Sequence, residues 1–285
     1  MAANDGKINF HALRHRWEMP LIWLSVLVTL LSLGLSLAVV FTDEAVLRAR
    51  FGDLAADLLD YAQTALLLLV LPLFIFLMRF YTIAKAKSNA IRVGPKQMPQ
   101  IWVMYQSLCQ RLQMPRVPRL YVINGNGVVN AYAMSCNTRL GYVVIHSEIA
   151  MLIETCPEAV EFVLAHELGH HKLGHVSLWR IVVGFIPGLL PPLGISTTRA
   201  QEYSADRVAL KVCNHQGDAM KLLAVGPWMH RAVDDSGWLE QCEDERREVF
   251  VRLANVMSDH AVMVKRYKAL RDIEAKGYSS QGDMF

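Results

Sequence analysis

Residues 163–170 have the sequence VLAHELGH, and the interpretation of the whole chain depends on this stretch. Residues i and i+4 of an α-helix share a face, so His166 and His170 can both point at one metal ion. Glu167 lies one position along, close enough to hold a zinc-bound water and to take its proton as it attacks a carbonyl. The apolar residues before the motif favour a helix buried in the core over a surface helix that carries two histidines. The stretch therefore predicts a zinc site on a buried helix.

Two histidines and a water leave one zinc ligand to be found elsewhere in the chain. A metzincin would supply a third histidine at position 176, where this sequence has Val176. His171 and His175 do not share the helical face of the motif histidines. We expect them to be surface histidines or partners of the ligands.

A carboxylate on a second helix is the better candidate for the missing ligand. Glu202 and Asp206 are four residues apart on the predicted helix 199–214, so one face carries both. Glu202 can complete the site, and Asp206 can accept a hydrogen bond from a zinc-bound histidine. An exposed acidic helix face is the alternative interpretation. The rival carboxylates, which precede the motif, are Glu148, Glu154 and Glu158.

Two long apolar stretches near the beginning of the chain predict membrane-spanning helices. Residues 20–41 and 61–78 contain 22 and 18 residues without a charge, and each can cross about 30 Å of hydrocarbon as a helix. Lysines and arginines flank the pair on both outer sides and are scarce in the loop between. By the positive-inside rule, the loop lies outside and everything beyond about residue 80 lies in the cytoplasm.

A third uncharged stretch, residues 181–198, contains three prolines and three glycines. If His170 and Glu202 share a metal, they lie on the same side of any membrane, so the stretch cannot cross once. Eighteen residues are also too few to cross twice. We expect a re-entrant or interfacial hairpin beside the active site.

The remaining part predicts an α+β domain that is mostly helical with a small β-sheet. Residues 128–136 and 141–146 predict two strands of a hairpin that turns around residues 137–139. The predicted helices include 157–172, 199–214 and 239–257, and the tail from residue 278 is expected to be flexible.

Composition excludes several other classes of protein. The chain is 53% hydrophobic, and its net charge of +3 comes from 29 basic and 26 acidic residues without a basic block, so no nucleic-acid partner is expected. The five cysteines are scattered, odd in number and form no CxxC. They do not suggest a disulfide framework or a thiolate zinc site.

The order HELGH, 31 further residues, then EYSAD closely resembles the HtpX-like peptidases, relatives of the CAAX prenyl proteases. The shared pattern is HExxH followed by ExxxD. Residues 129–133, VNAYA, are similar to the Asn-Ala strand that precedes the active helix in that family. Two amino-terminal membrane segments followed by a cytosolic catalytic domain also match the family's order of elements.

The resemblance implies a gluzincin-like zinc metalloendopeptidase with one Zn²⁺ per chain. It assigns His166, His170 and Glu202 as ligands, Glu167 as catalytic base and Asp206 as the group that orients a ligand. It also suggests that Asn130 and Ala131, on an edge strand, bind protein or peptide substrates by their main chain. These residues are read from the sequence alone.

The predicted organisation is a membrane anchor over residues 1–82, a cytosolic peptidase domain over 83–277 and a flexible tail over 278–285. A bacterial inner membrane is the expected location, and misfolded membrane proteins are the expected substrates. An inactive membrane adaptor with the same fold and a zinc hydrolase of non-peptide substrates are the alternatives. An intact Glu167 argues against the adaptor, because a scaffold needs no general base between two ligands.

Overall fold

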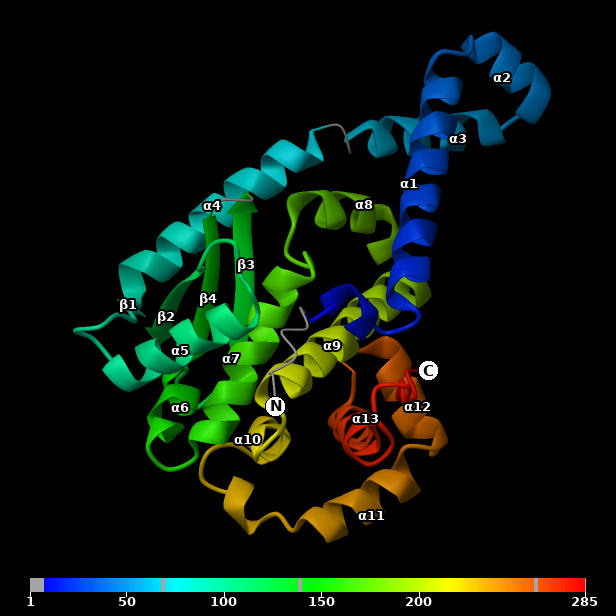
Figure 1. The fold of residues 1–285 in the computed structure, drawn as a ribbon. Helices are drawn as coiled ribbons and strands as arrows, with labels where there is room; N and C mark the ends of the chain where they lie inside the picture. Colours follow the sequence, from blue (N-terminus) through cyan, green and yellow to red (C-terminus); the bar gives the residue numbers. More distant parts are fainter. Residues whose placement is uncertain (1–7, 68–69, 138–139, 259–260, 285) are drawn as a thin grey trace.

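The computed structural model describes residues 8–67, 70–137, 140–258 and 261–284, and it is mostly helical with one four-stranded sheet (Figure 1). The fold class expected from the sequence is confirmed at this level. The amino-terminal elements are η1 (Phe10–Leu13), α1 (Glu18–Val40), α2 (Glu44–Phe51), α3 (Leu54–Leu66) and α4 (Leu71–Asn89). The central elements are β1 (Ile91–Arg92), α5 (Pro99–Arg111), β2 (Arg119–Ile123), β3 (Ala131–Asn137), β4 (Leu140–His146), α6 (Ser147–Ala150), η3 (Met151–Ile153) and α7 (Pro157–Lys172). The later elements are α8 (Leu178–Gly188), α9 (Pro191–Cys213), α10 (Ala219–Val225), η4 (His230–Ala232), α11 (Asp235–Glu245), α12 (Val249–Met257) and α13 (Met263–Lys276).

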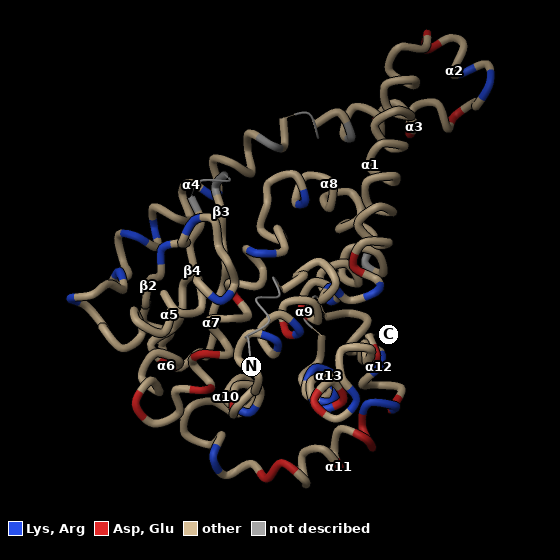
Figure 2. The backbone as a smooth tube through the Cα atoms, viewed as in Figure 1, with Lys and Arg blue, Asp and Glu red and all other residues tan. Residues whose placement is uncertain are grey.

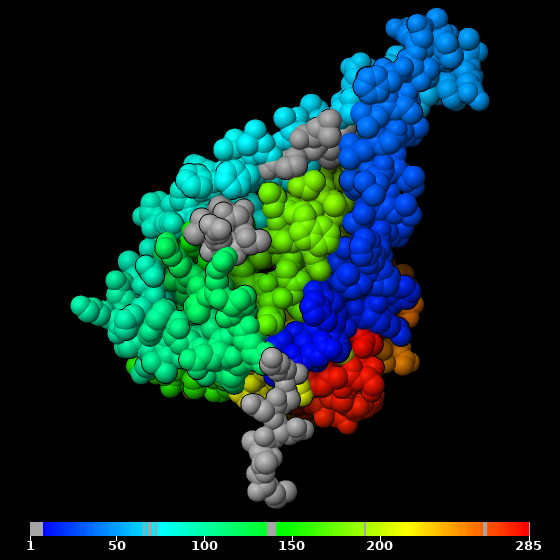
Figure 3. Space-filling view, turned by 45° about the horizontal axis from the view of Figure 1, so that its top comes forward, coloured from blue at the N-terminus to red at the C-terminus, as the bar shows by residue number. Residues whose placement is uncertain are grey.

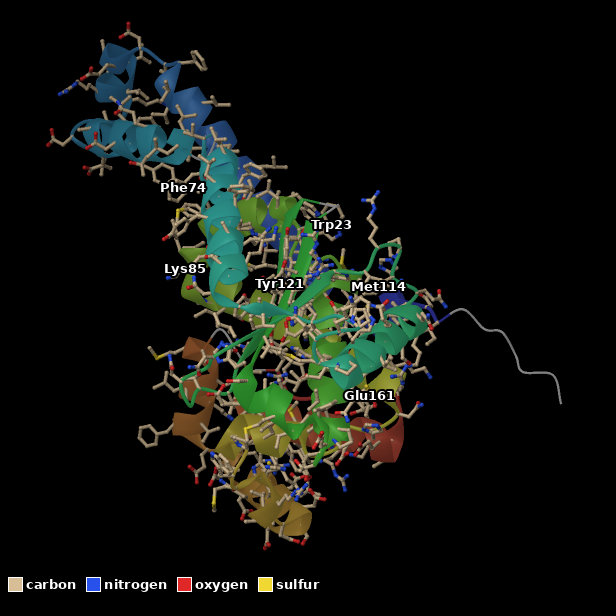
Figure 4. The ribbon with its side chains drawn as sticks, turned by 90° about the vertical axis from the view of Figure 1, so that its left-hand side faces the viewer. Trp23, Phe74, Lys85, Met114, Tyr121 and Glu161 are labelled. Carbon is tan, nitrogen blue, oxygen red and sulfur yellow. The ribbon has the colours of Figure 1, made fainter. Side chains whose placement is uncertain are left out.

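The sheet has the strand order β1-β2-β4-β3, with β2 parallel to β4 and the other pairs antiparallel. The predicted hairpin is confirmed by the pairing of β3 with β4, while turn residues 138–139 lie outside the described part. Alternating side chains divide the sheet between two cores. Leu120 and Val143 belong to the main core with α5 and α7, whereas Tyr121 and Val144 pack against α4. Figure 4 shows α4 running past Phe74 to Lys85 beside the strand of Tyr121.

Helix α7 begins and ends where the sequence predicts, at Pro157 and Lys172. It lies between the sheet and α9, and most of its residues are buried. Gly169 lies at the contact between the two helices, where a Cβ would lie 3.4 Å from the backbone of Ala205. The helix with the histidines thus lies directly against the helix with Glu202.

The stretch 181–198 forms a helical hairpin in which α8 ends at Gly188 and α9 begins at Pro191. The helix predicted over residues 199–214 therefore begins earlier than expected, at Pro191, because a proline in the first turn favours the start of a helix. Gly194 allows the tight return, because its Cβ would lie 2.6 Å from the Cα of Gly188. Figure 3 shows α8 at the surface between α1 and α4. His170 and Glu202 are on the same side of this hairpin, as their shared site requires.

Among the described residues, α1 is the one helix long and apolar enough to cross a membrane. It lies near the amino terminus and carries few charges, whereas α2 beyond it carries both signs (Figure 2). The second predicted segment, 61–78, covers the end of α3 and the start of α4, and residues 68–69 between them lie outside the described part. The described residues therefore contain one amino-terminal candidate for a membrane span, α1, rather than the two predicted.

The carboxy-terminal part differs from the prediction in two places. The predicted helix 239–257 is divided into α11 and α12, because α11 packs on α13 while α12 packs on α9. The tail expected to be flexible, 278–285, instead lies against α9 as far as Met284, which is buried. The guanidinium of Arg207 donates hydrogen bonds to the carbonyls of Tyr278 and Ser280, and these bonds hold the tail in place.

Candidate active site

Helices α7 and α9 bring together the three predicted metal ligands. His166 Nε2 lies 3.1 Å from His170 Nε2 and 3.4 Å from Glu202 Oε2. His170 Nε2 lies 3.3 Å from Glu202 Oε1. Donors about 2.1 Å from a tetrahedral zinc ion are about 3.4 Å from one another. The two imidazoles and the carboxylate therefore have the spacing that one metal ion needs, and no backbone movement is required to bind it.

The electrostatics of the site also favour a cation. Burial alone would lower the pKa of His166, but its hydrogen bond to Asp206 and the charges of Asp206 and Glu202 raise that pKa to about 10. Positive charge is thus stabilised at the place where the three donor atoms meet. A metal cation would satisfy the same carboxylates without protonating the ring.

His166 is oriented by residues of α9 and α13. Its Nδ1 donates to Asp206 Oδ1 at 2.8 Å, which leaves Nε2 for a metal. Arg266 of α13 forms a bidentate pair with Asp206, Nε to Oδ2 at 2.8 Å and Nη2 to Oδ1 at 2.6 Å. Arg266 also lies 3.4 Å from Glu202, so one guanidinium supports both carboxylates of α9.

His170 is held by a different set of residues. Its Nδ1 lies 2.9 Å from Nδ1 of His175, and Nε2 of His175 lies 3.1 Å from Oε1 of Glu18. Burial lowers the pKa of His175 to about 3, so this ring is neutral and accepts the Nδ1 proton of His170. Glu18 is fully buried at the start of α1, where Arg14 and Arg180 pair with its carboxylate. The amino-terminal helix therefore reaches the metal site through His175.

Glu167 lies in the same pocket as the three candidate ligands. The pocket has a volume of about 510 Å³, and its lining includes Glu167, Asn130 and Ala131. Burial, followed by the charge of Glu202, raises the pKa of the Glu167 carboxyl, while the two histidines oppose this effect. Both predicted substrate-binding residues thus border the cavity that contains the predicted base.

The other predicted candidates lie elsewhere. His171 is hydrogen-bonded through Nε2 to the carbonyl of Tyr142 at 3.0 Å and points away from the metal donors. Glu148 accepts hydrogen bonds from the backbone of Gly125 and Gly127, and Glu154 is exposed. Glu158 lies next to Cys156 at the other end of α7. None of these residues lines the pocket among the described residues.

A larger hollow of about 1120 Å³ lies beside His171 and Trp179, but it contains none of the three metal donors. We place the candidate active site in the smaller pocket because the donors and Glu167 are there.

Sequence reasoning missed Arg266 and Glu18. Arg266 is one basic residue among several in 263–276, and no spacing relates it to Asp206, which is 60 residues away. Glu18 offered a weak signal, since it is a charged residue directly before an apolar stretch. Its partner His175 is 157 residues away and could not be identified from the sequence.

Comparison with known proteins supports the assignment of the motif region. Residues 95–185 match the model of peptidase family M48, which covers the edge strand and the whole of α7 but ends before Glu202. No solved structure matches the chain. Because the matched region carries the HELGH helix, this similarity to peptidase family M48 confirms the resemblance predicted from the sequence and supports a metallopeptidase.

Proposed function

We propose that this protein is a membrane-anchored zinc endopeptidase of the HExxH gluzincin type, with one zinc in the active site of each chain, held by His166, His170 and Glu202. The observation that carries the proposal is the proximity of the donors in the pocket that also contains Glu167: the two Nε2 atoms are 3.1 Å apart, and each lies 3.3–3.4 Å from one oxygen of the Glu202 carboxylate. A bound zinc ion would polarise a substrate carbonyl and make water more acidic.

The chain's own residues supply the remaining parts of the reaction. Glu167 is the general base, because it is adjacent in sequence to a ligand and borders the cavity where a substrate carbonyl would lie. Asp206 and His175 each accept the Nδ1 proton of one ligand histidine, which keeps Nε2 available for the metal. The low exposure of Glu167, 7%, limits competing contact with solvent.

A polypeptide substrate fits the position of β3. This strand is at the edge of the sheet, paired on one side with β4, and packs against α7. An extended substrate could add to the open side of β3 by main-chain hydrogen bonds, beginning near Asn130 and Ala131. Main-chain pairing is tolerant of sequence, which suits unfolded protein segments and misfolded membrane proteins as substrates, and does not suit nucleic acid.

The surface pattern of α1 supports membrane anchoring. Small polar residues of α1 face the protein, and Thr29 Oγ1 donates to the carbonyl of Val183 at 2.8 Å. Large apolar residues face outward, including Trp23 at 65% exposure and Leu31 at 63%. This inside-out arrangement is typical of a helix whose outer surface contacts lipid. We therefore propose an anchor over residues 1–82, with 61–78 as its second crossing and 181–198 as a hairpin at the membrane surface.

The distribution of Lys and Arg supports a cytoplasmic peptidase domain over residues 83–277, and the bacterial inner membrane is the proposed location. Quality control of membrane proteins is the role that this location and the tolerant substrate edge favour.

The test follows cleavage of casein by the full chain in detergent with added zinc. Glu167→Gln should lower the rate at least about 100-fold, because the general base is lost while the ligands remain. Treatment with a chelator should abolish cleavage, and zinc should restore it. Glu161→Gln is the matched control on the same helix, since Glu161 pairs with Arg111 and His215 outside the pocket. It should retain activity.

The outcomes separate the alternatives. A folded wild type that binds zinc and cleaves no polypeptide would contradict the endopeptidase proposal and favour the adaptor or a hydrolase of other substrates. A Glu167→Gln variant with full activity would contradict the role of Glu167 as base.

A further inference from the structure

A second group of potential metal ligands lies at the other end of α7 from the histidines of the active site. Cys156 is the residue directly before α7, Asp218 directly precedes α10, and His230 begins η4. The sulfur of Cys156, a carboxylate oxygen of Asp218 and a ring nitrogen of His230 all lie within 4.8 Å of one another. Three elements that are distant in sequence thus present three different ligand types to one point.

His230 is the observation that indicates a ligand. Its side chain is buried, with 2% exposure, and its Nδ1 lies 2.8 Å from the carbonyl of Pro227. Because a carbonyl only accepts, Nδ1 carries the proton and Nε2 carries the lone pair. Within the described residues Nε2 has no hydrogen-bond partner. A buried acceptor without a partner is costly, and a metal ion at Nε2 would remove that cost.

The surroundings of Cys156 favour a cation as well. The thiol is 1% exposed and donates to Glu158 Oε1 at 3.2 Å. The carboxylates of Glu158 and Asp218 both lie close to this sulfur. The same two carboxylates would stabilise a divalent cation, which in turn would stabilise the thiolate.

Asp218 can contribute to such a site without leaving another charge unpaired. Its Oδ1 lies 3.2 Å from Lys221 Nζ, but this ammonium also pairs with Asp235 at 2.8 Å. Gly217 holds the loop close to Glu158, because a Cβ there would lie 2.6 Å from Cγ of Glu158. The carboxylate of Glu158 contacts the sulfur of Cys156, but it is not one of the three donors that lie within 4.8 Å of one another.

We propose that Cys156, Asp218 and His230 bind a second zinc ion that is separate from the active site. Sulfur, imidazole and carboxylate are the ligand types that zinc combines in proteins. The donors of a tetrahedral site lie about 3.5 Å apart, so binding would draw the three residues together by about 1 Å. The spacing of the cysteines in the sequence gave no sign of this site, since its ligands come from separate elements.

The position of the site gives the second ion a structural role. It would link the start of α7 to α10. The later turns of α7 carry His166 and His170. Met220 and Leu223 of α10 line the active-site pocket. The second ion would therefore fix one wall of that pocket relative to the helix that carries the catalytic residues. The proposal does not depend on peptidase activity, since metal binding can be measured without a substrate.

The test uses the full chain in detergent with Zn²⁺ or Co²⁺ as the probe. We expect wild type to bind two zinc ions per chain and Cys156→Ser to bind one. Bound cobalt should give a thiolate-to-cobalt charge-transfer absorption, because Cys156 is a ligand and no sulfur lies among the active-site donors. The absorption should disappear in Cys156→Ser and persist in Glu167→Gln.

Cys213→Ser is the matched control, because Cys213 is also buried and free. It should keep both metal ions and the absorption. If Cys156→Ser does not fold, His230→Gln gives the same information, since it removes one ligand and retains the thiol. One zinc per folded wild-type chain without the cobalt absorption would overturn the proposal, and so would an absorption that persists in folded Cys156→Ser.

Discussion

The two proposed ligand histidines, His166 and His170, lie one turn apart on α7, but different regions of the molecule hold them. The support of His166 lies entirely within the peptidase domain, where Asp206 of α9 pairs with Arg266 of α13. The support of His170 passes through His175 to Glu18, the first residue of the membrane-anchor candidate α1. The first partner is a salt-bridged carboxylate, and the second is a neutral imidazole with a carboxylate behind it.

The two supports are therefore expected to have different effects. A carboxylate directly behind His166 raises the basicity of the ligand and therefore its affinity for a metal. A neutral ring behind His170 orients the ligand but adds less negative charge. The His175 ring also links the proposed metal site to the amino-terminal helix. The packing of α1 and the orientation of His170 therefore depend on the same buried residues. We expect loss of the first support to affect metal affinity most, and loss of the second to affect the attachment of α1.

The largest effect on metal binding is expected for Asp206→Asn. An amide cannot neutralise Arg266, and it polarises His166 less than a carboxylate does. Zinc affinity should fall about 10- to 100-fold. Arg266 would lose its bidentate partner and keep only Glu202 at 3.4 Å, which should also lower the free energy of unfolding by about 3 kcal/mol. Zinc titration against a competing chelator and thermal unfolding measure the two effects.

Asp272→Asn is the control for this variant, because Asp272 pairs with Lys268 and Lys276 away from the metal donors. It should leave zinc affinity unchanged. Zinc affinity equal to wild type in Asp206→Asn would show that the Asp206 support does not act on the metal.

An intermediate effect is expected for His175→Gln. This change removes the acceptor of the His170 Nδ1 proton and leaves the carboxylate pair of His166 intact. Zinc affinity should fall about 10-fold, at the lower end of the range for such supporting residues. His171→Gln is the matched control, since His171 is a half-buried histidine next to His170 that bonds to the carbonyl of Tyr142. Equal losses in the two variants would contradict a specific role for His175.

The smallest effect on zinc, and a large one on stability, is expected for Glu18→Gln. Glu18 acts on His170 only through His175, so zinc affinity should change less than about threefold. Its removal leaves Arg14 and Arg180 buried without their shared carboxylate, which should cost about 3 kcal/mol of stability. Thermal unfolding in detergent measures this loss.

Glu44→Gln, which removes an exposed ion pair with Arg48 on α2, should leave stability unchanged. If Glu18→Gln weakened zinc binding as much as Asp206→Asn, the two supports would be equivalent and the contrast between them would be wrong.

Much of the candidate site was predictable because it depends on local geometry. The spacing of His166 and His170, and of Glu202 and Asp206, fixes which side chains share a helical face, whatever surrounds the helix. Proline and lysine at the two ends of 157–172 fixed α7 in the same way. The positions of Asn130 and Ala131 at the pocket followed from the family resemblance, and the roles of all these residues remain predictions.

Elements whose limits depend on packing were predicted less well. Residues 239–257 have helical periodicity throughout, but contacts with two different helices divide them into α11 and α12. The tail beyond residue 277 has no periodic pattern, and the guanidinium of Arg207 holds it in place. Propensity and periodicity describe one segment at a time and contain no information on which distant segment it will meet.

The sequence by itself determined the helix that carries the HELGH motif, the potential ligand types available on it and the apolar stretches at the amino terminus. Only the tertiary structure decided that Arg266 and Glu18 reach the site, and that Cys156, Asp218 and His230 converge. The physical reason is the range of the interactions. A turn of helix fixes neighbours four residues apart, whereas a buried ion pair forms between residues that the fold happens to bring together, at any separation along the chain.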